Sequence, residues 1–520
     1  MEEASPTALK LKHTIYNGSK TVSNFNRSRP ISMLTPFTTT EGGVNYANWR
    51  QAGVLTFRSG PLRQNAAYST VEVENAQLQL VWSQPIGSMR IADGSVHGVA
   101  APGQPLIVKW PTELRKNMAL YEEAKGVTAL KEVMVAGQDG KVHFYNLLTG
   151  EATRDAIDIG APSRGGLSLG TNGTPILAVG QYNSKLANKT VKNGLHILNL
   201  VTNEKAMLVA GDDKDKNSNY SGVTGAPLFD SATGTMIFGG QNGVLYTAEL
   251  GTVKDTYNYP ANVVELSNAL QGYKTLAGEQ KKTLTNIDAS VAMYNNYVYY
   301  GDQAGILQCV DVNTLTPVWV VDTDDNIDST PALDIEDGEK VVLYTGNTIT
   351  NRTQRSATAA IRRIDALTGK VEWVYEVPDL IYTAKQDNGC YASPVIGQNS
   401  IGDLVIYTVS YGREASHVIA LNKADGALVW ETVLEGPSIS SPVAVYNQEG
   451  NAWLVQAEQS GKVHLMNART GAILSSLQLQ PVENPEAKIV LEGSPAVYGN
   501  LVVIGTMGSN AGGVYCIKID

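Results

Sequence analysis

Four polar residues share one position in a repeated stretch of the sequence, and their side chains are those of an oxygen-rich binding site. Each stands three residues before an anchor residue, usually the proline of a Ser/Thr-Pro pair, that begins an apolar run: Asp288, Asp328, Tyr391 and Glu492. In two further copies the same position is filled by Thr224 and Ile439. The three acids could therefore act as one group.

If the repeats surround a common axis, these three carboxylates converge at one end of it. Converging carboxylates predict a site for a hard cation such as Ca²⁺, or for a cationic ligand. The alternative is that each carboxylate accepts hydrogen bonds from neighbouring backbone amides and only ties the repeats together. The alternative is favoured, because structural networks often place acids in this way.

A second set of oxygen ligands lies in the loop DDKDKNSN at 212–219. Asp213, Asp215 and Asn217 alternate along this loop, a spacing at which carboxylate and amide oxygens can wrap Ca²⁺. The loop lacks the Gly at the sixth position and the Glu at the twelfth position that an EF-hand requires. A solvated polar loop is therefore the favoured interpretation, with a calcium site as the alternative.

Three histidines, His143, His196 and His464, also share a repeat position, the third residue before an Asn that starts a turn. Equivalent residues of successive repeats lie on different structural units. They are therefore predicted to be structural strand residues and not ligands of one metal ion. The sequence shows no Ser-His-Asp grouping and no phosphate-binding loop, so no catalytic residue is predicted.

The elements that must position these residues are repeated hairpins. A turn with Gln, any residue and Gly, followed by alternating apolar residues, occurs four times: GQDGKVHFYN at 137–146, GQNGVLYTAE at 240–249, DQAGILQCVD at 302–311 and EQSGKVHLMN at 458–467. A second Gly turn follows, as in DALTGKVEW at 365–373 and NKADGALVW at 422–430. Such a unit predicts four antiparallel strands in about 45–55 residues, the size of one propeller blade.

The repeat predicts an all-β fold, an eight-bladed β-propeller of four-stranded antiparallel blades. The eight units begin near Gly98, Gly160, Gly222, Asn286, Asn326, Gly389, Ser438 and Leu491. The last unit has only three strands, and its fourth is predicted in NAQLQLVWSQP at 75–85, which contains Trp82. An N-terminal strand thus closes the ring and removes an exposed sheet edge. Trp319, Trp373 and Trp430 stand near fourth-strand ends and are predicted to lock blade to blade.

Three regions complete the predicted domain organisation. Residues 1–60 are rich in Ser, Thr and Asn and are predicted to form an irregular N-terminal extension. Residues 61–520 are predicted to form the propeller, in which residues 262–285 are an inserted helix or loop. In the second unit Asn203 stands where a turn Gly is expected.

Charge and cysteine content exclude several classes of protein. The formal net charge of −10 leaves no basic excess to neutralise phosphates, which excludes an unaided nucleic-acid binder. Cys309, Cys390 and Cys516 are far apart, which excludes a disulfide framework and a CxxC metal site. No apolar run reaches the ~18 residues of a membrane helix, so the chain is not predicted to span a membrane. The start, MEEASPTALK, fits either a cytoplasmic protein or one whose export signal has been removed.

The combination of Gly turn, Thr-Gly turn and closing Trp resembles the quinoprotein-like family of eight-bladed propellers with pyrroloquinoline quinone (PQQ) repeats. The resemblance covers about residues 75–520 and is greatest to exported bacterial PQQ-like propeller proteins of unassigned function. Three segments carry that likeness: VLTFRSGPLRQNAAY at 54–68, GQPLIVKWP at 103–111 and SPAVYGNLVVIGT at 494–506. The chain is similar, more distantly, to the outer-membrane assembly lipoprotein BamB, a scaffold without catalysis.

The resemblance implies two alternative functions. The first is a non-catalytic binding or scaffold protein of the bacterial envelope or extracellular space, a monomer that binds a protein or glycan with a propeller face or funnel. The second is a quinone-dependent dehydrogenase or another small-molecule enzyme. The isolated cysteines cannot form the vicinal disulfide of many alcohol-oxidising members, and no Trp is predicted on the axis. The first function is therefore favoured, with no PQQ expected and Ca²⁺ as a possible ligand.

Overall fold

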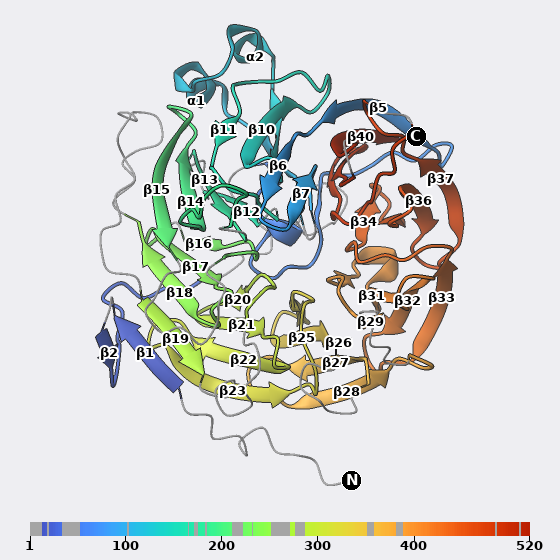
Figure 1. Cartoon of the computed structure of the whole chain (residues 1–520). Coiled ribbons are helices and arrows are strands. Elements are labelled where there is room, and N and C mark those ends of the chain that lie inside the picture. Colours follow the sequence, from blue (N-terminus) through green and yellow to red (C-terminus); the bar gives the residue numbers. More distant parts are fainter. Residues whose placement is uncertain are drawn as a thin grey trace.

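The computed structural model describes most of the chain. The described residues are 13–17, 20–33, 52–100, 103–164, 166–170, 175–182, 185–210, 222–230, 232–250, 271–275, 286–350, 358–380, 388–483, 486–508 and 511–520. They confirm the predicted fold class, because eight sheets, each built on four antiparallel strands, surround a central axis (Figure 1). The structure is thus an eight-bladed β-propeller.

The first four blades contain the following strands, given from the axis outward. Blade 1 has β8 (Leu106–Lys109), β9 (Lys131–Ala136), β10 (Lys141–Asn146) and β11 (Ile157–Asp158). Blade 2 has β12 (Leu167–Leu169), β13 (Ile176–Gly180), β14 (Gly194–Asn199) and β15 (Glu204–Ala210). Blade 3 has β16 (Leu228–Asp230), β17 (Thr235–Gly239), β18 (Leu245–Glu249) and β19 (Gln271–Thr275). Blade 4 has β20 (Ala292–Tyr294), β21 (Tyr297–Gly301), β22 (Ile306–Asp311) and β23 (Thr316–Asp322).

The remaining blades repeat this order. Blade 5 has β24 (Ala332–Glu336), β25 (Lys340–Gly346), β27 (Ala360–Asp365) and β28 (Val371–Glu376). Blade 6 has β30 (Val395–Ile396), β31 (Leu404–Ser410), β32 (Ser416–Asn422) and β33 (Leu428–Leu434), with β26 (Thr348–Ile349) and β29 (Asn388–Gly389) beside β31. Blade 7 has β34 (Val443–Tyr446), β35 (Ala452–Ala457), β36 (Lys462–Asn467) and β37 (Ile473–Gln478). Blade 8 has β38 (Ala496–Tyr498), β39 (Leu501–Gly505), β40 (Gly513–Ile519) and β5 (Leu78–Pro85).

The ring closes through the predicted N-terminal strand. β5 pairs antiparallel with β40, from Leu78 opposite Ile519 to Pro85 opposite Gly513. Trp82 of β5 then reaches forward into blade 1, where its Nε1 donates to the Leu147 carbonyl at 2.8 Å. The first and last parts of the propeller are therefore joined within one sheet (Figure 1).

The fourth-strand tryptophans lock neighbouring blades together, as predicted. Trp319 of blade 4 donates from Nε1 to the Ala366 carbonyl of blade 5 at 2.8 Å, and its ring lies against Gly369. Gly369 has a φ of +76°, which favours glycine. A Cβ atom on Gly369 would lie 2.7 Å from the Trp319 ring, too close for any side chain. Glycine at position 369 is therefore required both for the backbone conformation of the turn and for the close approach of the Trp319 ring.

We expect Gly369→Val to lower the free energy of unfolding clearly more than Gly338→Val does. Both glycines have a φ of +76°, so both substitutions introduce similar backbone strain of about 1–2 kcal/mol. Only the Cβ at position 369 meets a neighbour, because nothing lies within 4 Å of a Cβ at position 338. Urea unfolding of the two variants measures the difference. Equal losses of unfolding free energy in the two variants would show that the contact with Trp319 does not contribute to stability.

A chain of hydroxyl groups explains the Ser/Thr-Pro pairs. In blades 3 to 7 the backbone N–H of the residue before the anchor donates to the hydroxyl of the equivalent residue in the next blade, at 2.9–3.1 Å. The chain of bonds begins at Ala226 and runs through Ser290, Thr330, Ser393 and Ser441 to Ser494. All these side chains are buried. The hydroxyls therefore satisfy backbone donors that would otherwise be buried without a partner.

Residues 53–71, which we name the axial segment, lie inside the ring and contact all eight blades. β3 (Gly53–Val54) pairs with β8 of blade 1, and β4 (Ala67–Tyr68) pairs with β38 of blade 8. Between them the segment bonds with the first strands of the other blades, as in Leu169 N–H to Leu55 O (2.8 Å) and Leu333 N–H to Leu62 O (2.8 Å). Figure 1 shows it as a blue trace within the ring.

Two buried arginines hold the axial segment in place. Arg58 is 1% exposed and donates to the carbonyls of Pro394 and Pro442, and Arg63 is 0% exposed. Arg63 donates to Val291 O and Ala226 O, both at 2.8 Å. Burial lowers the pKa of each guanidinium to about 9. The axial segment therefore closes the channel at the level of the anchor residues and just beyond them.

Two of the predicted irregular regions contain strands instead. Within residues 1–60, β1 (His13–Asn17) and β2 (Lys20–Val22) form a hairpin, and β1 pairs with β19 at the outer edge of blade 3. Within 262–285, predicted as a helix or loop, residues 271–275 are β19 itself. β19 forms because it pairs on both sides, with β18 and with β1. No local sequence pattern predicts this strand. The rest of 262–285 lies outside the described residues.

Smaller elements lie between the blades. The hairpin of β6 (Ser88–Ile91) and β7 (Gly94–His97) joins β5 to blade 1. Two short helices, α1 (Thr112–Asn117) and α2 (Glu122–Gly126), connect β8 to β9. The short 3-10 helices Phe57–Ser59 and Asn399–Ile401 lie in the axial segment and before β31. Asn203, which replaces a turn Gly, has a φ of +60° and so adopts the left-handed conformation that its position requires.

His196 of β14 gives blade 2 a pH dependence. Burial, aided by the charge of Lys205, lowers the pKa of His196 from 6.5 to about 4. Above pH 6.5 the imidazole is neutral in the folded and unfolded chains, so the full stability is present. As the pH falls from 6.5 to 4, the unfolded chain binds a proton that the folded chain excludes, which lowers the free energy of unfolding by up to about 3 kcal/mol. Urea unfolding at pH 7 and pH 4.5 should show less loss in His196→Gln than in the parent protein, and an equal loss would contradict this assignment.

Candidate functional site: the axial cavity

A cavity of about 430 Å³ occupies the axis of the propeller. Its lining includes the residue three before the anchor in seven of the eight blades, together with residues from the turns above them. The lining residues are Val96, Ala100, Gln138, Arg164, Tyr182, Thr224, Asp288, Gln303, Asp328, Tyr391, Ile439, Glu492 and Met507. The axial segment bonds to carbonyls at the anchor residues of blades 4, 6 and 7 and just before the anchor of blade 3, next to the residues that line this cavity.

The structure brings together the four residues that the repeat singled out. Asp288, Asp328, Tyr391 and Glu492 all line the cavity, each half-buried, from blades 4, 5, 6 and 8. The other predicted group, Asp213, Asp215 and Asn217, lies outside the described residues.

Sequence reasoning missed Arg164, the cationic side chain of the cavity. Leu169 bonds to the axial segment as Leu333 does, so Leu167 is the anchor of blade 2 and Arg164 stands three residues before it. The signal was weak because Leu167 replaces the anchor proline and glycines replace the hydroxyl residue. The Arg164 guanidinium lies over the Tyr182 ring, 4.5 Å from its centroid. The ring of equivalent positions therefore carries both signs of charge.

The Gln residues of the repeated Gly turns hold the carboxylates. Gln241 Nε2 donates to Asp288 Oδ1 at 2.9 Å, and Gln303 Nε2 donates to Asp288 Oδ2. Thr224 Oγ1 also donates to Asp288 Oδ1 at 3.1 Å. Asp288 thus joins blades 3 and 4, which supports the structural alternative, although the donors are side-chain amides and a hydroxyl where backbone amides were expected.

The other two acids have different kinds of partner, a Gln of a repeated turn for Glu492 and an Asn of the same blade for Asp328. Gln459 Nε2 donates to Glu492 Oε1 at 3.0 Å, and Asn326 Nδ2 donates to Asp328 Oδ2 at 2.6 Å. Burial raises the pKa of Glu492, and the charge of Arg164 partly opposes this shift. The Gln of the repeated turn, in which Gln is followed by any residue and Gly, therefore has a role besides forming the turn. Its Gln reaches the axis and fixes a carboxylate.

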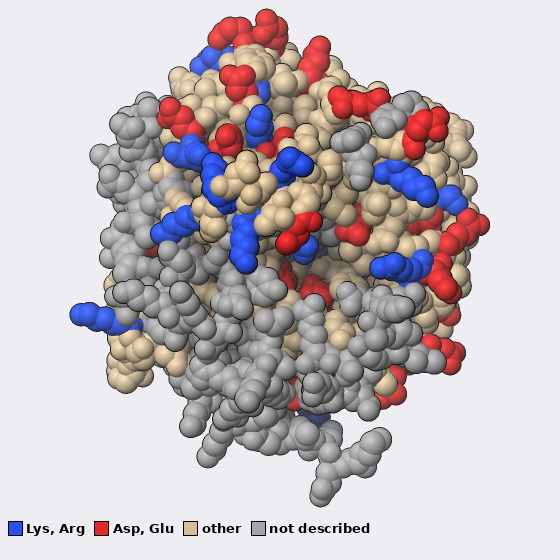
Figure 2. Space-filling model, in the orientation of Figure 1, with Lys and Arg blue, Asp and Glu red and all other residues tan. Residues whose placement is uncertain are grey.

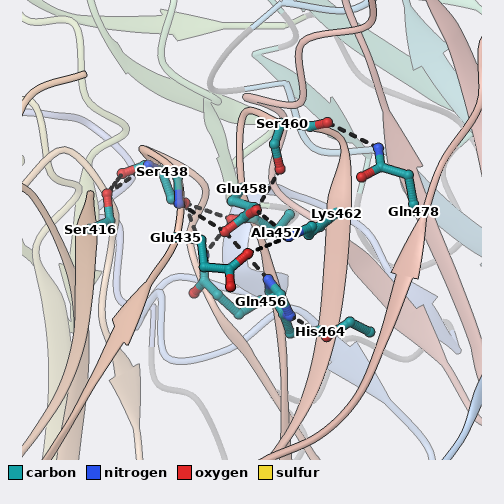
Figure 3. Close-up of polar contacts among 12 residues, drawn as sticks. Ser416, Glu435, Ser438, Gln456, Ala457, Glu458, Ser460, Lys462, His464 and Gln478 are labelled. Carbon is teal, nitrogen blue, oxygen red and sulfur yellow. Dashed lines mark hydrogen bonds and ion pairs between the residues drawn. The ribbon is translucent and has the colours of Figure 1, made fainter. Parts of the chain in front are cut away.

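A second polar group lies between blades 6 and 7 (Figure 3). Glu458, which is 1% exposed, accepts a hydrogen bond from Ser460 at 2.5 Å and lies 3.5 Å from His464 Nε2. Burial by itself raises the pKa of Glu458, but the nearby His464, the hydrogen bond from Ser460 and the charge of Lys462 together outweigh burial and lower the pKa below its usual value. His464 therefore lies beside a buried acid within blade 7, which is a structural role.

The three repeat-equivalent histidines do not form one site. They lie on β10, β14 and β36, in blades 1, 2 and 7, and His143 bonds with Asp139 at 2.9 Å. In the part of the chain that the structure describes, no group of three or more His, Cys, Asp or Glu side chains is placed to hold a metal ion. A metal centre is thus not built from these residue types in the described blades.

The face around the cavity carries separated charges. Figure 2 shows acidic side chains near the centre of the disc and basic side chains grouped over blades 1 and 2. Part of this basic group lies where the β6–β7 hairpin meets residues 185–190, which are joined by backbone bonds from Ala187 to Arg90 (3.3 Å) and from Ala92 to Lys185 (3.1 Å). Arg90, Lys185 and Lys189 are exposed there. This face is suited to a polar or charged ligand.

Comparison with known proteins gives the fold relatives. The family model described as outer membrane protein assembly factor BamB matches residues 399–519. A quinohemoprotein alcohol dehydrogenase from Comamonas testosteroni has a similar structure, with 13% identity, a TM-score of 0.58, and coverage of 90% of this chain and 80% of that chain. Another from Pseudomonas putida HK5 has 12% identity, with the same TM-score and coverage. BamB from Moraxella catarrhalis has 17% identity and a TM-score of 0.46, with coverage of 85% and 97%.

These identities are low, so the structural likeness shows a common fold and nothing finer. No curated protein sequence matches the chain. None of the helices among the described residues is long and apolar enough to cross a membrane.

Proposed function

Because the chain has the eight-bladed fold of the quinoprotein-like, PQQ-repeat propellers, a fold that scaffolds and dehydrogenases share, we propose that it is a non-catalytic binding protein of the bacterial envelope or extracellular space. The cavity-bearing face is its binding surface for a protein or glycan. The match of its last blades to the BamB family model supports a scaffold role in the envelope. A rigid ring that presents loops on one face is well suited to such binding.

The observation that carries this proposal is the composition of the cavity wall. The described lining contains no Cys, His, Lys or Ser, and the Asp288 carboxylate accepts three hydrogen bonds from neutral side chains. These bonds fix the acid in position and use several of its acceptor sites. An acid fixed in this way is suited to recognising the hydrogen-bond donors or the positive charge of a ligand.

The residues of this cavity do not fit PQQ, the redox group of the dehydrogenases with this fold. PQQ is a planar tricarboxylate, and the lining offers three carboxylates and one arginine to it, so the net interaction is repulsive. The described lining has no tryptophan to stack on a flat ring system. Cys309, Cys390 and Cys516 are buried in three different blades. No step through PQQ is therefore derived, and dehydrogenase activity is the second candidate function.

Adding PQQ and CaCl₂ to the purified protein separates the two candidates. We expect no change in visible absorbance and no dye reduction with ethanol or glucose, because the cavity repels the quinone's carboxylates. A quinone-dependent alcohol dehydrogenase serves as the positive control for the reagents. Turnover of either substrate would overturn the binding role.

A further inference from the structure

The axial cavity carries charges of both signs, supplied by different blades. Asp288 and Asp328 come from blades 4 and 5, and Arg164 comes from blade 2. Among the described residues neither Asp288 nor Arg164 has an ion-pair partner, and the donors to Asp288 are neutral. Among the described residues, no oppositely charged side chain therefore contacts either Asp288 or Arg164.

Gln303 adds a buried acceptor to the acidic wall. This residue is 7% exposed and lines the cavity, and its Nε2 donates to Asp288 Oδ2. That bond fixes the orientation of the amide, because the reversed amide would set its oxygen against a carboxylate. The remaining atom, Gln303 Oε1, is buried and has no hydrogen-bond partner. A buried acceptor of this kind calls for a donor, and a ligand in the cavity can supply one.

We propose that the cavity binds a zwitterion with a primary ammonium group and a carboxylate, namely an amino acid or a short peptide. This inference rests on the proposed function, since it treats the cavity as a binding site. An ammonium group has three N–H donors and a positive charge, which match Gln303 Oε1 and the carboxylate of Asp288. The ligand carboxylate pairs with the fork of N–H donors on Arg164.

The size of the cavity favours a peptide over a free amino acid. Its volume of about 430 Å³ lies in the range of cavities that enclose a small organic ligand. Arg164 stands two blades from Asp288 and three blades from Asp328 around the ring, and we expect a dipeptide to span this separation better than one amino acid does. Tyr182, Tyr391 and Ile439 supply apolar surface for the ligand's side chains between the walls.

Calorimetric titration of the full chain at low ionic strength tests the ligand class. The probes are alanyl-alanine, free alanine, N-acetyl-alanyl-alanine, which lacks the ammonium group, and alanyl-alanine amide, which lacks the carboxylate. We expect alanyl-alanine to bind, and each charge-deficient analogue to bind at least tenfold more weakly. Alanine binding as tightly as the dipeptide would assign the site to free amino acids.

Single substitutions test whether Asp288 and Arg164 bind the ligand. Asp288→Asn and Arg164→Gln should each weaken alanyl-alanine at least tenfold, whereas Glu435→Gln, at an exposed residue outside the cavity, should leave the affinity unchanged. Arg164 is exposed, so its variant tests the proposal even if Asp288→Asn disturbs the hydrogen bonds of Gln303. Thermal melting of each variant confirms that it is folded.

Three results would overturn the inference: no heat with either alanine or alanyl-alanine, equal binding of the N-acetyl analogue, or unchanged affinity in Arg164→Gln. Any of these without dye reduction by PQQ would reject the ligand class and leave the binding role intact. Dye reduction would instead reject the binding role itself.

Discussion

Deletion of residues 61–84 is expected to leave no stable native protein. The deletion removes nearly all of β5, which is the fourth strand of blade 8, and exposes the edge of β40. It also removes β4 and Arg63, whose guanidinium joins the axial segment to blades 3 and 4. An open ring with an exposed sheet edge and unpaired buried carbonyls should aggregate.

Soluble expression, size-exclusion chromatography and thermal melting measure this outcome, and two single substitutions refine it. Trp82→Ala removes only the contact between blades 8 and 1 and should cost about 3–5 kcal/mol. Val81→Thr, at a neighbouring position of β5 that is 44% exposed, is the matched control and should change little. A deletion variant that remains monomeric and melts like the parent protein would contradict closure of the ring by β5.

Glu132→Gln is expected to cost about 3–5 kcal/mol, because it leaves the charge of Arg154 buried without a counter-charge. Both residues are almost fully buried in blade 1, at 0% and 2% exposed. Arg154 Nε and Nη2 donate to the two Glu132 oxygens at 3.0 and 2.9 Å, and Trp110 Nε1 donates to Oε2 at 2.7 Å. The substitution therefore weakens several hydrogen bonds at once.

A double substitution tests this explanation. The pair Glu132→Met and Arg154→Leu together should be less damaging than Glu132→Gln alone, since no charge remains buried. Glu113→Gln is the matched control, because Glu113 also pairs with a base, Lys116, but is 66% exposed, and it should cost at most about 1 kcal/mol. Urea unfolding gives all values. Equal effects of Glu132→Gln and Glu113→Gln would show that burial does not set the strength of the pair.

The candidate site could be predicted in part because the repeat places equivalent residues at equivalent radii. One position, three residues before the anchor, predicts that acids converge at one end of the axis, and the structure places Asp288, Asp328, Tyr391 and Glu492 of that position in one cavity. Arg164 was missed because its blade has neither the proline nor the hydroxyl residue that marks this position. The partners of the carboxylates were also missed, since the Gln of the repeated turn had been read only as part of a turn.

The blades, their number and the closing strand can be predicted from the sequence, because alternating apolar residues, turn glycines and Trp at fixed spacing are local signals. The position of the axial segment within the ring and the pairing of β1 with the edge of blade 3 depend on tertiary contacts. Arg58 meets the Pro442 carbonyl across 384 residues of chain, and β1 pairs with β19 across more than 250. No local pattern encodes such contacts, because carbonyl groups and sheet edges accept many sequences and only the closed ring brings these partners together.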